Sequence, residues 1–180
     1  LTVVCGCGGG DAVRAVLPQV LSMAPRLVLD ADALNAVAAD TGLRALVRAR
    51  AGRQLVTVLT PHPLEAARLL GSNAAAVQYN RLAAARQLAD ALGCTAVLKG
   101  SGTVVAAPGQ IPVLNLTGNA RLGTAGTGDV LAGLIGAHLA SGQKAFQAAC
   151  AAVHGHGQAA DDWPDDDALT AGALARRLRV

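Results

Sequence analysis

A glycine-rich turn that runs straight into an apolar helix constrains this chain more than any other feature. The turn covers residues 123–129 and the apolar run covers residues 130–137. Small residues let a ligand approach the backbone closely, and the free N–H groups and dipole of a helix N-terminus favour an anion, most often a phosphate. Asp129 stands at the mouth of that helix, where a carboxylate either caps the helix or acts as a base beside a bound phosphate. The sequence predicts a nucleotide phosphate site, with a plain loop–helix junction as the alternative.

Length and composition indicate a single α/β domain with no nucleic-acid or membrane partner. The 180 residues are 52% hydrophobic but only 2% aromatic, so Ala, Val and Leu must build the core. Such side chains favour helices packed closely against a sheet. The arginines are scattered and form no basic block with interleaved aromatics, which argues against nucleic acid. No apolar run reaches the roughly 18–20 residues of a membrane span.

The chain ends and the cysteines predict the extent of the domain and a reducing, cytoplasmic environment. The chain opens inside an apparent strand and without a charged leader, so we expect one domain over residues 1–180 that lacks an upstream segment. The spacing of Cys5, Cys7, Cys94 and Cys150 matches no zinc or redox pattern. Cys5-Gly6-Cys7 has the ligands for a metal, but small buried thiols in a reducing cytoplasm are the expected case. Residues 161–167 are expected to form a solvated turn rather than a calcium site, and the arginines at 176–179 a solvated helix end.

Short β-branched runs alternate with longer Ala- and Leu-rich runs along the whole chain. The expected strands are residues 1–4, 26–29, 56–59, 96–98, 103–106 and 111–115. The expected helices are residues 13–23, 32–40, 41–50, 63–70, 77–92, 129–141 and 144–161. Alternation of this kind implies a mostly parallel central sheet with helices on both faces. The turn signal at residues 107–110 adds a β-hairpin near 103–115.

Polar residues follow five of the expected strands, at the edge where ligands bind in sheets of this type. They are Gly6, Gly8 and Gly10; Asp30 and Asp32; Thr60, His62 and Glu65; Lys99; and Asn115, Thr117 and Asn119. Because carboxyl ends of parallel strands share one edge, these groups are expected to converge there.

Six motifs, in order and over most of the chain, resemble the NAD(P)H-hydrate dehydratase family of the ribokinase-like superfamily. They are Gly6-Cys7-Gly8-Gly9-Gly10, residues 29–35, Thr60-Pro61-His62-Pro63-x-Glu65 with the helix after it, Lys99-Gly100-Ser101-Gly102-Thr103, residues 115–119 and Gly126-Thr127-Gly128-Asp129. The last motif occurs widely among ribokinase-like kinases. Its combination with the 60–65 and 99–100 motifs is much more specific.

The resemblance implies a ribokinase-like fold and the repair of hydrated NADH or NADPH. The ring hydroxyl would be phosphorylated at the expense of ADP or ATP, and phosphate would then be eliminated, since phosphate leaves far more readily than hydroxide. Bacterial members typically use ADP and release AMP; the residues here leave ADP against ATP open. Mg²⁺ is expected because it neutralises phosphate charge, with no direct protein ligand. Relatives assemble into homo-oligomers, often tetramers.

The resemblance also implies a role for each matched position. Asp129 would be the catalytic base. The anion hole would be Ala125, Gly126, Thr127 and Gly128. The nucleotide would contact Lys99, Gly100, Ser101, Gly102, Thr103 and Gly128, and the hydrated cofactor Gly8, Gly10, His62 and Asp129. Asn115 and Asn119 are candidates for phosphate or metal-bound water.

Several residues keep a structural alternative. Glu65 either serves function or only orders its loop, and Asp30 and Asp32 are either site residues or turn formers. His62 and Lys99 each have a plain loop or solvated interpretation. His154 and His156 do not share a helix face, so we expect packing or rim groups rather than metal ligands.

The chain departs from the family pattern at three places. Cys7 stands where the family usually has proline. Arg121 is a local novelty that would touch phosphate or face water, and residues 170–173 lack the usual Asp, which puts capping of the last helix in doubt.

Two other functions compete with the dehydratase hypothesis. One is a small-alcohol kinase of the same superfamily, acting on a thiazole or pyrimidine alcohol. The other is a catalytically idle nucleotide-binding scaffold, which the expected loss of an upstream segment would favour.

Overall fold

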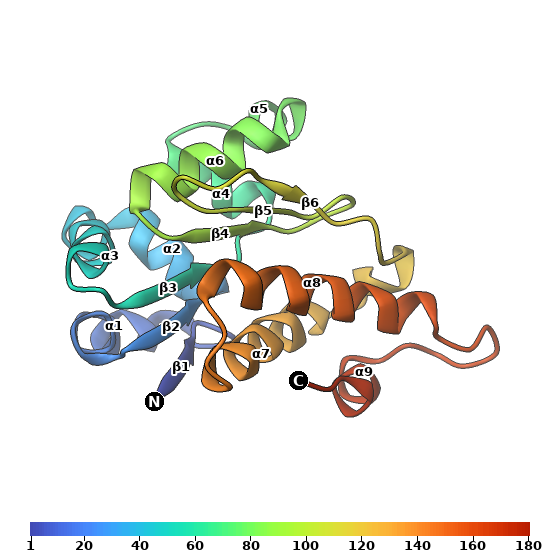
Figure 1. Cartoon of the computed structure of the whole chain (residues 1–180). Helices are drawn as coiled ribbons and strands as arrows, with labels where there is room; N and C mark the ends of the chain where they lie inside the picture. The colour runs from blue at the N-terminus through green and yellow to red at the C-terminus, as the bar shows by residue number, and fades with distance from the viewer.

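The computed structural model describes all of residues 1–180 and contains one six-stranded sheet. The strands lie in chain order: β1 Thr2–Cys5, β2 Arg26–Leu29, β3 Val56–Leu59, β4 Thr95–Leu98, β5 Val104–Ala106 and β6 Val113–Leu114. The first four are parallel, while β5 runs antiparallel to β4 and β6 antiparallel to β5 (Figure 1). The mostly parallel sheet and its hairpin are therefore confirmed.

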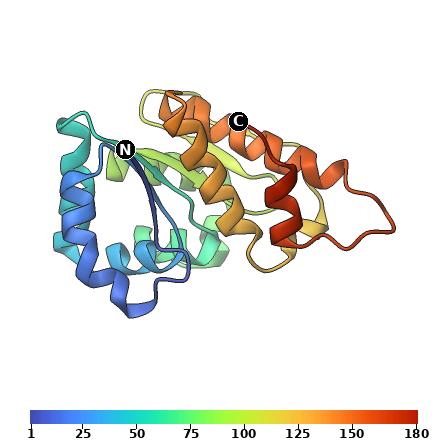
Figure 2. The same ribbon diagram turned by 90° about the horizontal axis from the view of Figure 1, so that it is seen from below.

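Helices cover both faces of this sheet (Figure 2). On one face lie η1 Gly10–Ala12, α1 Val13–Met23, α2 Ala31–Ala39, α3 Thr41–Gly52, α4 Pro63–Leu70, α5 Ala74–Tyr79 and α6 Arg81–Leu92. On the other lie α7 Thr127–Ala140 and α8 Ala145–Asp161, with α9 Ala171–Arg177 packed outside them; η2 Ala120–Gly123 links β6 to α7. No helix has both the length and the apolar character needed to cross a lipid bilayer.

Strand side chains alternate between two cores. In β2, Leu27 and Leu29 pack with the helices α1 to α6, whereas Val28 packs with α7 and α8. Strands buried on both faces read as continuous apolar runs, which is why the sequence signal was clear. Small residues let the helices approach closely: a Cβ at Gly136 in α7 would lie 2.6 Å from Val4 Cγ2 of β1.

The predicted helix over residues 77–92 is wrong. The chain breaks at Asn80, whose side-chain oxygen accepts a hydrogen bond from Ala83 N–H and starts α6. Asparagine competes for backbone groups in this way and so favours caps over helix interiors.

The last helix, α9, is capped although residues 170–173 lack the Asp that is usual in the family. Thr170 Oγ1 accepts a hydrogen bond from Ala173 N–H at 3.2 Å.

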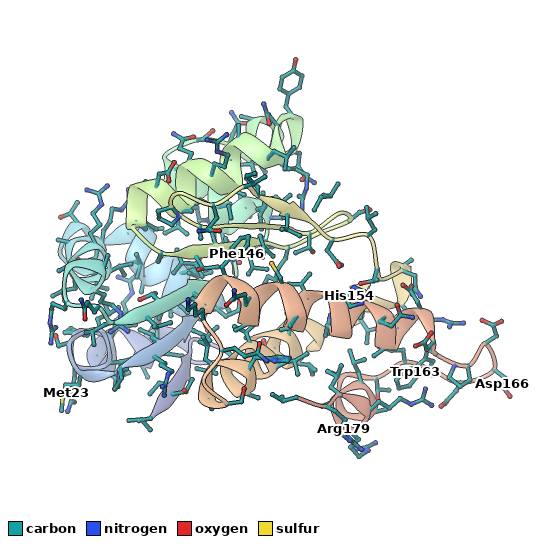
Figure 3. The ribbon with its side chains drawn as sticks, viewed as in Figure 1. Met23, Phe146, His154, Trp163, Asp166 and Arg179 are labelled. Carbon is teal, nitrogen blue, oxygen red and sulfur yellow. The ribbon has the colours of Figure 1, made fainter.

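The arginines at 176–179 are exposed at the end of α9, as expected, and one of them also makes a contact that the sequence did not predict. The Arg177 guanidinium stacks 4.0 Å from the ring centroid of Trp163, a favourable cation–π geometry. Trp163 lies beside α9, while Asp166 projects from the tip of the loop that joins α8 to α9 (Figure 3). The stacked pair holds that loop against the body of the protein.

Candidate active site

The carboxyl edge of the sheet carries a cleft of about 750 Å³. It collects side chains that follow different strands, as the strand-end argument predicted. His62 follows β3, Lys99 follows β4, the 115–123 segment follows β6, and Gly128 opens α7. Because β6 runs parallel to β4, its carboxyl end reaches the same edge. The cleft lining also includes Gly100, Ser101, Thr103, Asn115, Thr117, Asn119, Thr127, His156 and Gly157.

The N-terminus of α7 presents unused amides to a ligand. Gly126 adopts φ +85° at the N-cap, a conformation that favours glycine. The N–H groups of Ala125, Gly126 and Gly128 have no acceptor within the protein, whereas Thr127 N–H donates to Thr124 O at 3.3 Å. Three of the four predicted anion-hole amides are therefore available. The amide of Asp129 is also unused.

The side chains of Thr127 and His156 stabilise the conformation of this turn through hydrogen bonds to its carbonyl groups. The Thr127 hydroxyl lies 2.6 Å from Leu122 O and 2.8 Å from Thr124 O. His156 Nε2 donates to Thr127 O at 2.9 Å. Burial lowers the pKa of His156, so the imidazole stays neutral with its proton on Nε2. The sequence assigned His156 to packing or the rim; in the structure it supports the turn that begins α7.

Lys99 lies between Asp30 and the start of α7. Its ammonium nitrogen is 2.7 Å from Asp30 Oδ1, and Asp30 is only 1% exposed. The same nitrogen is 3.5 Å from where a Cβ would lie on Gly128. A helix N-terminus repels a cation, and the buried carboxylate offsets that repulsion. An anion at the mouth of α7 would meet both the free amides and this ammonium group.

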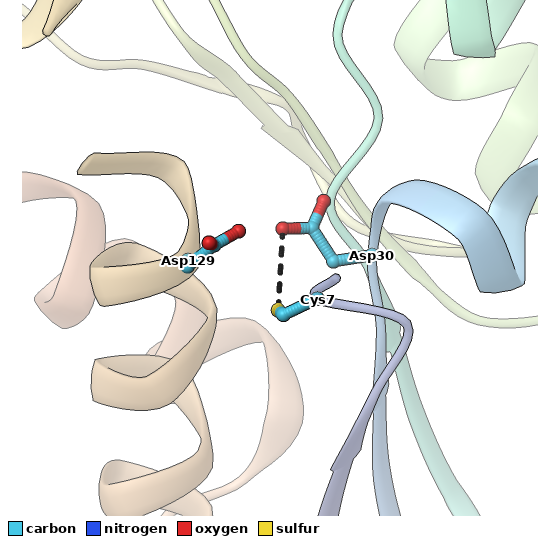
Figure 4. A group of neighbouring side chains, drawn as sticks. All are labelled: Cys7, Asp30 and Asp129. Atoms are coloured by element: carbon cyan, nitrogen blue, oxygen red, sulfur yellow. Dashed lines mark hydrogen bonds between the residues drawn. The ribbon is translucent and has the colours of Figure 1, made fainter. Parts of the chain in front are cut away.

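Asp129 points away from its own helix cap and toward Cys7 and Asp30 (Figure 4). One ligand atom from each of the three residues lies within 4.8 Å of the others. The carboxylate of Asp129 is exposed and accepts no hydrogen bond from an α7 amide, so it does not cap α7. Burial first, and then the charges of Asp30 and Asp129, raise the pKa of the Cys7 thiol to about 12. Cys7 is thus a neutral thiol beside two carboxylates.

The turn before α4 is a capping box built by His62 and Glu65. His62 Nδ1 accepts from the Leu64 and Glu65 amides at 3.1 and 3.4 Å, and Glu65 Oε2 accepts from His62 N–H at 2.8 Å. Glu65 therefore orders the loop, one of its two interpretations. Since Nδ1 accepts, the ring proton sits on Nε2. The His62 side chain is 47% exposed and borders the cleft.

The polar side chains after β6 are engaged within the protein and shape the cleft wall. Asn115 Nδ2 donates to Thr117 O at 2.9 Å, and Asn119 Nδ2 donates to Ala160 O at 2.8 Å. Asp161 accepts from Gly118 N–H at 2.7 Å.

Arg121 lies partly in water, as one of its two interpretations has it, and also contacts the loop after α8. Its guanidinium donates to Trp163 O at 3.0 Å and pairs with Asp165 at 2.9 Å. It ties the cleft wall to the loop after α8.

The glycine loop after β1 lies beside the cleft rather than in its lining. Gly8 and Gly10 have φ of +61° and +54°. Gly10 N–H donates to Asp32 Oδ2 at 2.8 Å, so Asp32 serves as a turn former while Asp30 belongs to the site.

The loop between β4 and β5 depends on a residue that the sequence did not single out. Gly100 and Gly102 have φ of +137° and +65°. Arg81 Nη2 reaches the carbonyls of Leu98, Lys99 and Gly102 at 3.0 to 3.2 Å. Burial lowers the pKa of Arg81. A single arginine at a helix start carries no sequence signal that separates it from a surface residue.

A parallel sheet whose strand ends meet a glycine-rich helix N-terminus, with a bare carboxylate and a lysine beside it, defines a ribokinase-like protein. The family model Carb_kinase, which represents NAD(P)H-hydrate dehydratase, matches residues 2–179, and the chain belongs to that family.

Curated relatives and solved structures agree with this assignment. The ADP-dependent (S)-NAD(P)H-hydrate dehydratase of Neisseria meningitidis serogroup B is 47% identical over 178 residues, which are 98% of this chain and 59% of the relative. The bifunctional NAD(P)H-hydrate repair enzyme Nnr of Escherichia coli is 41% identical over 157 residues, 87% of this chain and 28% of the relative. The chain thus spans less than two thirds of these relatives.

Among structures, an ADP/ATP-dependent NAD(P)H-hydrate dehydratase from Bacillus subtilis, co-crystallised with ATP/Mg²⁺ and soaked with CoA, has a TM-score of 0.79 at 32% identity. The match covers 97% of this chain and 63% of that one. A hydroxyethylthiazole kinase from Pyrococcus horikoshii has a TM-score of 0.70 at 19% identity, with 99% of this chain and 72% of that one covered; it shares the fold.

Proposed function

We propose that this chain carries out the nucleotide-dependent dehydration of hydrated NADH or NADPH, with ADP as phosphoryl donor and AMP and phosphate as products. The observation that carries the proposal is the uncapped carboxylate of Asp129 beside unused amides and the Lys99 ammonium. Membership in the NAD(P)H-hydrate dehydratase family supports the substrate, and the name of the Neisseria relative supports ADP over ATP.

In the first step, Asp129 takes the proton of the ring hydroxyl as that oxygen attacks the terminal phosphorus of the nucleotide. The new P–O bond forms as the bond to the leaving nucleotide breaks. Ala125, Gly126 and Gly128 donate their amides to the phosphoryl oxygens, where negative charge gathers. Lys99 adds its positive charge on the same side.

In the second step, the lone pair of the ring nitrogen expels phosphate, and the C–O bond electrons leave with it. Loss of a proton from the neighbouring carbon restores the ring double bond. One of the two protons released in these steps ends on the phosphate and the other passes to solvent. The sum is hydrated cofactor and ADP in, and reduced cofactor, AMP, hydrogen phosphate and one proton out. Phosphorylation is needed because hydroxide itself is a poor leaving group.

The remaining contacts follow the cleft. The Lys99–Thr103 loop, with Lys99, Gly100, Ser101, Gly102 and Thr103, would hold the nucleotide. The exposed His62 ring, whose Nε2 lies 3.3 Å from Glu65 Oε1, and the Gly8–Gly10 loop would contact the hydrated cofactor. Asn115 would reach phosphate or water through its second amide N–H. Both amide N–H groups of Asn119 donate within the protein, to Ala160 O and Asp161 Oδ1, so Asn119 would reach only water, through its oxygen.

Magnesium fits this site only as a companion of the nucleotide. The group of metal-binding side chains that the fold brings together includes the Cys7 thiol, whereas Mg²⁺ prefers oxygen ligands in octahedral geometry. We therefore assign Mg²⁺ no protein ligand. Bound to the nucleotide phosphates, it would neutralise their charge. A homo-oligomer, tested first for a tetramer, is the proposed working state.

The decisive experiment incubates the protein with hydrated NADH and either ADP or ATP and follows the return of absorbance of the reduced ring. Asp129→Asn should abolish turnover while nucleotide binding persists. A stable phosphate ester as product would favour a small-alcohol kinase instead. Nucleotide binding without any turnover by the unaltered chain would favour the scaffold.

A further inference from the structure

Three ligand-bearing side chains from separate parts of the chain meet at the carboxyl edge of the sheet. Cys7 follows β1, Asp30 follows β2 and Asp129 lies in the first turn of α7. Figure 4 shows the three groups facing one another across the gap between the β1 loop and α7. One ligand atom from each lies within 4.8 Å of the others. Their spacing in the sequence matches no metal motif, so only the fold reveals the group.

Asp30 has one oxygen whose hydrogen-bond partner within the protein is the Cys7 thiol. Its Oδ1 pairs with Lys99, but the Oδ2 contact is a thiol at 3.9 Å, a long and weak one. The residue is buried, and a buried carboxylate oxygen without a good partner costs free energy. This oxygen points into the three-residue group, where a cation would satisfy it.

The charges of the group match a divalent ion. The cation must displace the thiol proton, which burial and the two carboxylates hold in place. With the thiol bound as a thiolate, all three ligands are anionic, and Lys99 is the cation paired with them. A divalent cation therefore makes the whole group neutral. Binding releases one proton from the thiol to solvent, and no bond to carbon changes.

The sulfur selects the kind of cation. Zn²⁺ binds Cys sulfur and Asp oxygen in tetrahedral sites, often with water as the fourth ligand. Tetrahedral geometry places ligand atoms roughly 3.5 Å apart, so one group must move by about 1 Å. Asp129 is exposed and free of helix hydrogen bonds, so its side chain has the freedom to make that move. Mg²⁺ and Ca²⁺ prefer oxygen ligands in larger number.

We propose that Cys7, Asp30 and Asp129 form a binding site for a thiophilic divalent cation of the Zn²⁺ class, which inhibits the enzyme by occupying the carboxylate of Asp129. The binding part stands on the geometry of these three residues. The inhibitory part rests on the proposed function, in which Asp129 must be free to accept a proton.

The binding test uses Co²⁺ alone as the probe, because it takes zinc-like geometry and a thiolate bound to it absorbs strongly. Titration of the unliganded protein should give a thiolate-to-cobalt band that saturates at one ion per chain and is bleached by Zn²⁺ but not by excess Mg²⁺. Cys7→Ser should lose the band. The matched control Cys150→Ser, a thiol that is also half-buried against the same core but lies in α8, outside the three-residue group, should keep it. No band in the unaltered protein, or a band that survives Cys7→Ser, overturns the proposal.

A second variant keeps the test decisive if Cys7→Ser fails to fold. Asp129→Asn changes an exposed side chain, and it should retain the band while weakening Co²⁺ binding at least about tenfold. Unchanged affinity would remove Asp129 from the site.

The activity test separates the two proposals. Zn²⁺ added with hydrated NADH and ADP should inhibit the unaltered protein reversibly, and a chelator should restore the rate. Cobalt binding at Cys7 without zinc inhibition overturns the inhibitory part alone. Absence of dehydratase turnover with intact cobalt binding overturns the proposed function and leaves the cation site standing.

Discussion

The Lys99 ammonium nitrogen lies 2.7 Å from Asp30 Oδ1, and the two residues are 69 positions apart in the chain. Asp30 is buried and Lys99 is 19% exposed, so the pair is shielded from water on one side. This arrangement keeps a cation beside the N-terminus of α7, where the helix dipole alone would repel it. The pair therefore links the end of β2, the end of β4 and the anion-binding turn.

Asp30→Asn should loosen this link. The variant leaves Lys99 without its countercharge near a positive helix end, so we expect a loss of about 1–3 kcal/mol in the free energy of unfolding. Denaturant unfolding measures it. In the double variant Asp30→Asn, Lys99→Gln the loss should be smaller than the sum of the two single losses. Additive losses would mean that the pair carries no coupling.

Gly128→Ala should weaken nucleotide binding without weakening the fold. The added methyl carbon would lie 3.5 Å from Lys99 Nζ, an ordinary contact, yet it would stand among the free amides of the turn. Alanine favours the helix by up to about 1 kcal/mol over glycine. We expect unchanged or higher stability and at least about tenfold weaker binding of ADP by calorimetry.

Gly133→Ala is the matched control for that variant, since it lies in the same helix with open space where the Cβ would be. It should gain similar stability and leave ADP binding unchanged. Equal effects of the two variants on ADP binding would show that α7 itself, rather than the room at Gly128, sets the affinity.

Most of the fold could be predicted from the sequence, because most helices and strands are determined by the residues within them and next to them. A few neighbouring residues are enough to predict that β2 is a buried strand and that α7 begins at a glycine-rich turn. The convergence of Lys99, Asp30 and the α7 turn on one edge followed from parallel strands. The capping of α4 by His62 and Glu65 also lies within four residues. One of the two interpretations of Glu65 from the sequence was this local role.

Long-range contacts could not be predicted from the same patterns. Arg81 braces the Leu98–Gly102 loop, His156 supports Thr127, and Arg121 holds Trp163. In the sequence each is a single polar residue on a helix or turn, with no periodicity to name its partner. The break at Asn80 was missed because apolar spacing continues across it, while one side-chain cap decides the outcome.

Gly157→Ala should disturb the wall of the cleft. A Cβ there would lie 2.6 Å from the backbone carbon of Thr117, which cannot move aside as a flexible side chain would. We expect a loss of at least about 2 kcal/mol in stability and a higher KM for the nucleotide. The control Gly155→Ala, with open space in the same helix, should be neutral or stabilising. A stable Gly157→Ala protein with normal KM would show that α8 and Thr117 do not need this close approach.

Acid should destabilise the folded protein through the buried ring of His156. Burial lowers the pKa of this histidine from its ordinary value of 6.5, because desolvation disfavours the charged ring, and the hydrogen bond to Thr127 O opposes that shift only in part. In the unfolded chain the ring takes up a proton at a higher pH than in the folded protein. Its contribution to stability is therefore complete above about pH 6.5 and falls as the pH drops toward the folded-state pKa. Unfolding free energies measured between about pH 5 and pH 8 should show this decline. His156→Gln keeps an N–H donor but cannot titrate, so the decline should be shallower in that variant. If the decline in His156→Gln were as steep as in the unaltered protein, groups other than His156 would cause the acid sensitivity.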